Sequence, residues 1–144
     1  MRKFKLFFVA LFTLGLIGCS TIYNSISVNS TLGLDNDQSI QSIQTMSQKA
    51  LYGVSTNNLC VAYYQNHPPL VKKEIERRGL ITSSGTWSDI DAGTVSSGMS
   101  LCQVLAAMGK PQSLSHGDQF LELNYNGKTI LLNKQQGQLT VVTK

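Results

Sequence analysis

Few residues in this chain have the types and spacing that catalysis or metal binding requires. The sequence contains two histidines, His67 and His116, and Asp118 stands two residues after the second of them. A site that combined His116 and Asp118 with Cys60 or Cys102 would bring a base to a nucleophile. No serine stands in a Gly-x-Ser-x-Gly elbow, and two histidines without clustered acidic residues make a poor metal site. We therefore expect no catalytic residue, no metal and no cofactor.

A third cysteine, Cys19, ends an N-terminal segment with the features of a secretion signal. Three basic residues stand within the first five positions, and residues 6–17 are almost continuously apolar. This run is shorter than the about 20 residues of a transmembrane helix, but it suits the apolar part of a signal peptide. The sequence Leu-Ile-Gly-Cys that ends at Cys19 resembles the bacterial lipobox. The resemblance implies that residues 1–18 are a lipoprotein signal peptide and that Cys19 is lipidated. With Ser20 next, it also implies an outer-membrane anchor with the domain facing the periplasm.

The charge of the chain is concentrated in this segment. The full sequence has a net charge of +4, but without residues 1–18 nine basic residues stand against eight acidic ones. A near-neutral domain lacks the basic face that nucleic-acid binding needs, so we expect no nucleic-acid partner. The remaining 126 residues are enough for one modest domain.

Cys60 and Cys102 form an even pair in a chain that we expect in an oxidising compartment. Such a pair is a candidate disulfide. The alternative is two separate small buried side chains, which is how free cysteine usually behaves. The sequence does not supply the Cα separation that would decide between them.

The first half of the domain has the patterns of short helices. Residues 19–36 are rich in Ser, Thr and Asn without a clear period, and we interpret them as a tether. We expect one helix over residues 37–53, a second from Thr56 to the residue before His67, and a third from Pro69 to Gly79.

Arg77 and Arg78 lie at the end of the third expected helix. They oppose the negative end of the helix dipole, and the spacing predicts ion pairs Lys72–Glu76 and Glu74–Arg78. We interpret this charge run as a solvated helix face. The functional alternative is a basic edge that faces anionic lipid or an acidic partner.

Two further helices precede a change of period. A short helical turn carries Trp87, which is expected to anchor the core, with a ligand platform as the alternative. Ser100 and Gln103 then predict a capping box at the start of a two-turn helix that ends at Gly109.

After Pro111 the apolar residues alternate, as in strands. We expect strands over residues 121–125, 128–134 and 139–143, with a type I′ turn at Asn126-Gly127. The prediction is an α+β fold in which several short helices pack on one face of a three-stranded antiparallel C-terminal meander. It forms a single domain over residues 37–144, with a helical part over 37–95 and a helix plus meander over 98–144.

The lipobox, the Gly98-Met-Ser…Gln-Val…Gly-Lys-Pro111 helix and the meander together resemble the SmpA/OmlA (BamE-like) family of small outer-membrane lipoproteins. The resemblance covers Cys19 and about residues 57–144, with an additional helical segment upstream. It implies a non-catalytic lipoprotein that acts through protein contacts in envelope assembly or maintenance.

We expect the partners to be the membrane, through Cys19, and envelope proteins. A free edge of the last strand, residues 139–143, would suit strand addition. The alternative function is a tethered small-ligand or enzyme-inhibitor binding module. In that case a groove near Trp87 and Tyr125, or the basic Arg77 and Arg78, would form the binding surface.

Overall fold

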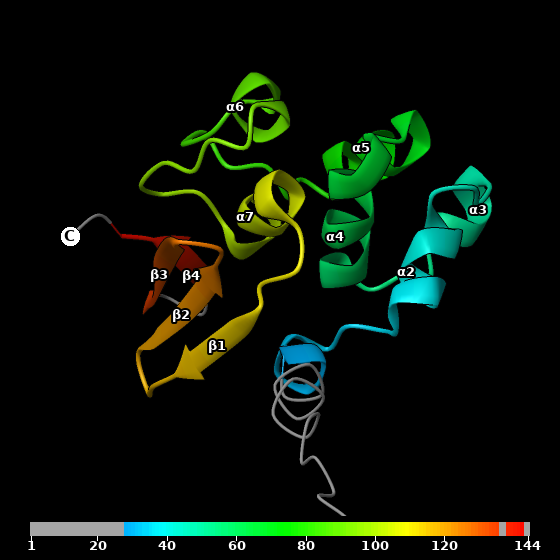
Figure 1. Cartoon of the computed structure of the whole chain (residues 1–144). Coiled ribbons are helices and arrows are strands. Elements are labelled where there is room, and N and C mark those ends of the chain that lie inside the picture. Colours follow the sequence, from blue (N-terminus) through cyan, green and yellow to red (C-terminus); the bar gives the residue numbers. More distant parts are fainter. Residues whose placement is uncertain (1–27, 136–137, 143–144) are drawn as a thin grey trace, which may run out of the picture.

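A computed structural model describes residues 28–135 and 138–142 (Figure 1). It confirms the α+β fold, with helices followed by an antiparallel sheet. The predicted signal peptide, Cys19 and residues 19–27 of the predicted tether lie outside the described residues. The helices are α2 (Asp37–Ile43), α3 (Gln48–Leu51), α4 (Thr56–Asn66), α5 (Pro69–Arg77), α6 (Trp87–Asp91) and α7 (Leu101–Met108). The strands are β1 (Ser113–His116), β2 (Phe120–Tyr125), β3 (Lys128–Gln135) and β4 (Gln138–Val141).

The helices begin where short polar side chains cap them. The side chains of Asn36, Ser47, Ser55, Thr86 and Ser100 each accept a hydrogen bond from the N–H three residues later. The single helix predicted over residues 37–53 is wrong, because α2 and α3 are separate. Ser47 starts a new helix there, and the hydroxyls of Ser42 and Thr45 bond to nearby carbonyls just before it.

The predicted tether is also wrong for residues 28–36, which are docked on the domain. Residues 28–32 are helical, and Leu32 and Leu34 are buried in the core. Asn57 Nδ2 donates to the carbonyl of Leu32 at 2.8 Å, and Asn58 exchanges two hydrogen bonds with Asp35. The scattered apolar residues of this segment therefore belong to the core, although they show no regular period.

The sheet has four strands in the order β1-β2-β3-β4, and the predicted three-stranded meander lacked β1. β1 pairs with β2 from Ser113↔Asn124 to His116↔Leu121. Leu114 is its one apolar residue, so no alternation marks it as a strand in the sequence. The predicted turn at Asn126-Gly127 joins β2 to β3, and Gly127 has a positive φ of 71°. The predicted type I′ is wrong, because that type requires a positive φ at both central residues and Asn126 does not have one.

The helices lie on one side of the sheet, with α7 against it and α4 on the far side of α7 (Figure 1). Alternate strand residues point into this core and are buried, whereas their neighbours point to the opposite face. The buried strand residues are Leu121, Leu123, Ile130, Leu132 and Val141. One core thus joins the helical part to the sheet.

Candidate functional site

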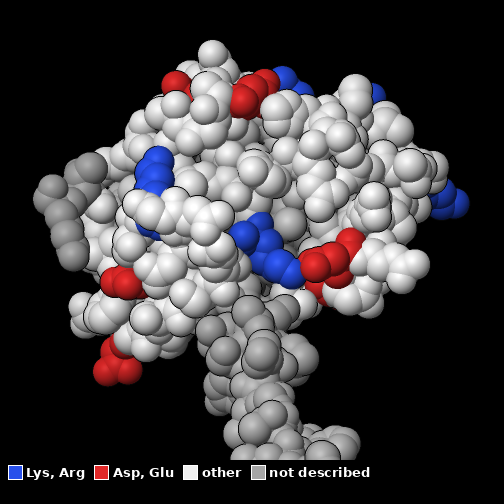
Figure 2. All heavy atoms as spheres, viewed as in Figure 1, with Lys and Arg blue, Asp and Glu red and all other residues white. Residues whose placement is uncertain are grey.

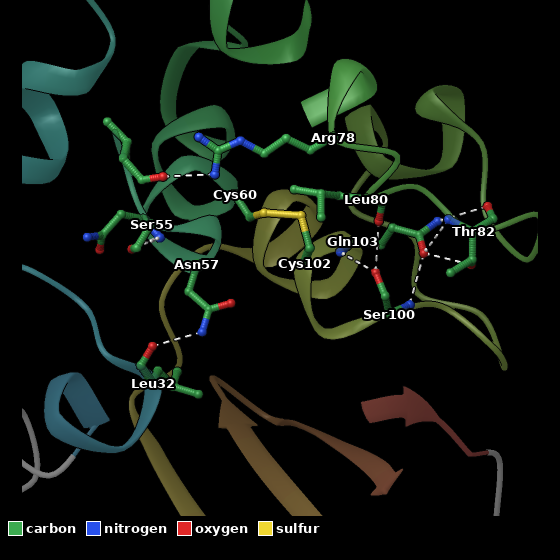
Figure 3. The surroundings of a disulfide bond; sticks show 12 residues. Leu32, Ser55, Asn57, Cys60, Arg78, Leu80, Thr82, Ser100, Cys102 and Gln103 are labelled. Carbon is green, nitrogen blue, oxygen red and sulfur yellow. Dashed lines mark hydrogen bonds between the residues drawn. A yellow bond between two sulfur atoms is a disulfide. The ribbon is translucent and has the colours of Figure 1, made fainter. Parts of the chain in front are cut away.

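The capping box predicted at the start of α7 is present, and its glutamine does more than cap a helix. Gln103 is fully buried, and its Oε1 accepts from the N–H of Ser100 at 2.9 Å. The same oxygen accepts from the N–H and the hydroxyl of Thr82, and Nε2 donates to the carbonyls of Thr82 and Gly85. Figure 3 shows the amide of Gln103 between Ser100 and Thr82. The motif that carried the family resemblance therefore holds the 80–85 loop on α7.

The segment before α7 also covers part of the last strand. The N–H of Gly98 donates to the carbonyl of Val141 at 2.9 Å, and the N–H of Val141 donates to the carbonyl of Met99. Ser100 makes an isolated antiparallel bridge with Thr140. The prediction of a free edge at the last strand is therefore wrong at Val141, where residues 98–100 already occupy the edge.

Cys60 and Cys102 are joined in a disulfide, with their Cα atoms 5.3 Å apart (Figure 3). Both residues are buried, and the bond links α4 to α7 next to Gln103. The two cysteines are consequently engaged with each other, and the thiol that a His116 and Asp118 site would need is already in the bond. His116 is the exposed last residue of β1, and Asp118 is exposed in the following bend.

Arg77 and Arg78 do not form a free basic edge, because both bind Glu74. Arg77 Nη2 lies 2.6 Å and Arg78 Nε 2.7 Å from Glu74 Oε1. Arg78 also donates to the carbonyls of Leu51 and Val54, which end α3 and lead into α4. The hydrogen bonds from Arg77 and then Arg78 hold the pKa of Glu74 down, at about 2.

The predicted solvated helix face is therefore wrong at its centre, since the side chain of Glu74 is fully buried. The predicted Glu74–Arg78 pair is present. Lys72, by contrast, has its ammonium 4.6 Å from the centroid of the Trp87 ring, instead of pairing with Glu76 as predicted.

Trp87 is an anchor for packing between helices, as its first interpretation predicted. The centroid of its ring lies 4.9 Å from that of buried Tyr63, and the ring of His67 stacks on Tyr63 with the centroids also 4.9 Å apart. Trp87, Tyr63 and His67 thus form a row of rings. Tyr63 donates its hydroxyl to Asp91 Oδ1 at 2.6 Å. Burial, and next the hydrogen bond to Asp91, raises the pKa of Tyr63. The row joins α4 to α6, with Lys72 of α5 over its outer end.

Tyr125 has a separate environment. Its hydroxyl donates to the carbonyl of Gly109 at 3.0 Å, and burial raises its pKa. Trp87 and Tyr125 are both in the described part of the chain, and their rings do not stack on each other. The structure therefore does not bring together the predicted surface of Trp87, Tyr125, Arg77 and Arg78.

The face of the sheet away from the helices is left largely uncovered by the other residues that the structure describes. This uncovered face is a candidate surface that sequence reasoning missed. Two hollows of about 290 and 430 Å³ adjoin there and share Glu122, Leu131 and Val142. The signal was the uninterrupted apolar run Ile130-Leu-Leu132 in β3. Three consecutive apolar residues place an apolar side chain on each face of a strand, so β3 has one on the face away from the helices.

The described residues contain no group of three or more His, Cys, Asp or Glu placed to hold a metal ion. Within residues 28–135 and 138–142, no helix is long and apolar enough to cross a membrane. Charged side chains are few and scattered on the face in Figure 2, most of which is uncharged.

Comparisons of the chain with protein-family models, with curated proteins and with solved structures gave no match in any of the three.

Proposed function

We propose that this chain is a lipid-anchored outer-membrane lipoprotein that acts by binding other envelope proteins and not by catalysis. The anchor rests on the lipobox at Cys19, and the mode of action rests on the uncovered face of the sheet. Phe120, at one end of that face, is 46% exposed, and Leu131 and Val142 beside it are partly exposed. Apolar side chains gathered on an exposed face are typical of interaction surfaces.

The contacts of the motif around α7 support a scaffold role for that region. Its buried polar groups are taken up by hydrogen bonds within the domain, and its two cysteines are joined. The resemblance to the SmpA/OmlA family supports only the part of this proposal that concerns envelope assembly or maintenance. The choice of the uncovered face as the binding surface does not depend on that resemblance.

Intact-mass measurement of the protein purified from native membrane tests the anchor. The expected result is loss of residues 1–18 and a mass gain equal to three acyl chains with their glyceryl group on Cys19. A Cys19→Ala variant is the matched control, and we expect it to leave the membrane fraction. An unmodified chain of full or conventionally cleaved length would exclude the lipoprotein.

Gentle solubilisation and purification of the native protein tests the mode of action. We expect a partner protein that co-purifies in a fixed ratio and is lost with Cys19→Ala. Recovery of the lipoprotein alone from such membranes would argue against a role through protein contacts.

A further inference from the structure

The face of the sheet away from the helices has a defined set of side chains, which we name the outer face. Glu122 lies opposite Leu131 and Phe120 opposite Asn133 in the β2–β3 register. Val142 follows β4 and donates its N–H to the carbonyl of Leu131, so it continues the row from Glu122. The outer face comprises Phe120, Glu122, Leu131, Asn133 and Val142.

The outer face is hollowed along this row. The hollow of about 290 Å³ is also lined by Val95, Lys128 and Thr129, and the hollow of about 430 Å³ extends to Phe120 and Asn133. Because both are lined by Glu122, Leu131 and Val142, the two form one continuous concave surface. Its size suits a row of side chains from another chain segment, and its walls are largely apolar.

Glu122 is the charged residue that lines both hollows, whereas Lys128 lines only the smaller one. Within the described residues its carboxylate has neither an ion pair nor a hydrogen bond. Its cross-strand neighbours are Leu131 and Ser115, neither of which carries a charge. A carboxylate that is partly shielded by apolar side chains attracts a cation more strongly than one fully in water.

This charge selects among the occupants that an apolar face could have. Where the two hollows meet, the carboxylate would repel anionic lipid, and a second copy centred there face to face would bring two Glu122 side chains together. A segment with a lysine or arginine among apolar side chains would satisfy both the hollows and the carboxylate. We propose that the outer face binds an apolar segment of a partner protein whose basic side chain pairs with Glu122.

This inference rests on the proposed function and names the chemistry of the partner. Its test places a photo-crosslinking amino acid at Asn133 in the full lipoprotein in its native membrane. The matched control has the crosslinker at exposed Ser88 on α6, on the helical side of the molecule. We expect a protein adduct from position 133 and none from 88, with a lysine or arginine in the crosslinked segment when mass spectrometry maps it.

Variants that change the charge of Glu122 test whether its carboxylate binds the partner. Glu122→Gln should lower the adduct yield about two- to fivefold, as expected for loss of one partly exposed ion pair. Glu122→Lys should lower it at least about tenfold, because like charges then face each other. Glu76→Lys makes the same charge change at an exposed site on α5 and should leave the yield unchanged. Equal thermal midpoints for the three variants exclude unfolding as the cause.

The apolar part of the surface has its own variant. Leu131→Ser should lower the yield several-fold, whereas Leu70→Ser, at an exposed leucine of α5, should not. An adduct that persists in both Glu122→Lys and Leu131→Ser would overturn the inference.

Four other crosslinking results would also overturn the inference. These are an adduct with a second copy of the chain, with phospholipid, or with residues 143–144 of the same chain, and the absence of any adduct. A partner that co-purifies but crosslinks only from position 88 would refute the inference and leave the proposed function intact. Absence of lipid on Cys19 would refute the proposed function whatever the crosslinks show.

Discussion

Gln103 and Glu74 are both polar, and both are fully buried. Each ties an irregular segment to a helix. Gln103 holds the 80–85 loop on the start of α7, and Glu74 with Arg78 holds residues 51–54 on α5. One side chain is a neutral amide, and the other is an anion that has two guanidinium groups as partners.

The two side chains solve the problem of burial differently. The amide has donors and an acceptor, and the surrounding N–H, hydroxyl and carbonyl groups match both. It therefore needs no charge. The ionised carboxylate only accepts, and its donors are the guanidinium groups of Arg77 and Arg78 and the side-chain amide of Gln48. Its pairing with the two cations depends on its ionisation. We call the contacts of Gln103 the neutral joint and those of Glu74 the charged joint. The difference predicts that the contribution of the neutral joint to the free energy of unfolding is independent of pH and that the contribution of the charged joint is not.

Giving the neutral joint a charge should have the largest effect. Gln103→Glu would place a carboxylate 3.2 Å from the carbonyl of Gly85, where Nε2 donates in the native protein. An unpaired buried charge costs about 3–5 kcal/mol of unfolding free energy at pH 7. Since burial raises the pKa of such a carboxyl, the loss should shrink towards pH 4, where the protonated group can donate. Urea unfolding of the variant and the wild type at pH 7 and pH 4 measures the loss of unfolding free energy and its decrease with falling pH. A loss of the same size at the two pH values would contradict the charge as its cause.

Removing the cross-link beside the neutral joint should have the next largest effect. Cys60 and Cys102 are 42 residues apart in sequence. Closure of a loop of this length in the unfolded chain corresponds to about 3–4 kcal/mol. The double variant Cys60→Ala/Cys102→Ala should lose this amount in urea unfolding, and reductant should bring the wild type to a similar level. Reductant should have no effect on the variant, which serves as the control.

The charged joint should show a smaller effect that follows pH. The pKa of Glu74 is lowered from 4.5 to about 2, mainly by the hydrogen bond from Arg77 and then that from Arg78, so the folded state prefers the ionised form. Its contribution is present above pH 4.5 and is lost as the pH falls towards about 2. The stabilisation by ionised Glu74 stays modest, because the side chain of Arg77 is 53% exposed and water screens the Arg77–Glu74 ion pair.

Thermal unfolding from pH 5 to pH 2 tests this dependence. Glu74→Gln should be less stable than the wild type at pH 5, and the difference should narrow as the pH approaches 2. Glu76→Gln, at an exposed carboxylate of the same helix, should follow the wild type throughout. A constant difference between Glu74→Gln and the wild type would show that the carboxylate acts by packing and not by its charge.

The elements that the sequence predicted well depend on neighbours a few residues away. The Ser100–Gln103 capping box and the position of the Asn126-Gly127 turn are examples, since each depends on residues within a four-residue stretch. The start of α5 at Pro69 follows in the same way from the fixed φ of proline. The α+β order of helices before strands follows from the change of period after Pro111.

Most of the errors concern residues whose environment is set by distant parts of the chain. The segment 28–36 has no periodic pattern and is docked by Asn57 and Asn58. β1 has almost no apolar residues and exists because β2 offers it a partner. The candidate outer face was missed because alternation shows which strand residues share a face but not which face the helices cover, and only the packing of the helices on one side of the sheet decided that.

The sequence by itself determined where most helices begin, where the hairpin turns and which strand residues form the core, because capping, turn angles and alternation are local. The tertiary structure alone decided that Glu74 is buried, that residues 98–100 cover the end of β4 and that Gln103 reaches Thr82 and Gly85. It also decided that Cys60 and Cys102 meet. Such contacts join residues 18 to 43 positions apart, and their formation depends on how all the helices pack together.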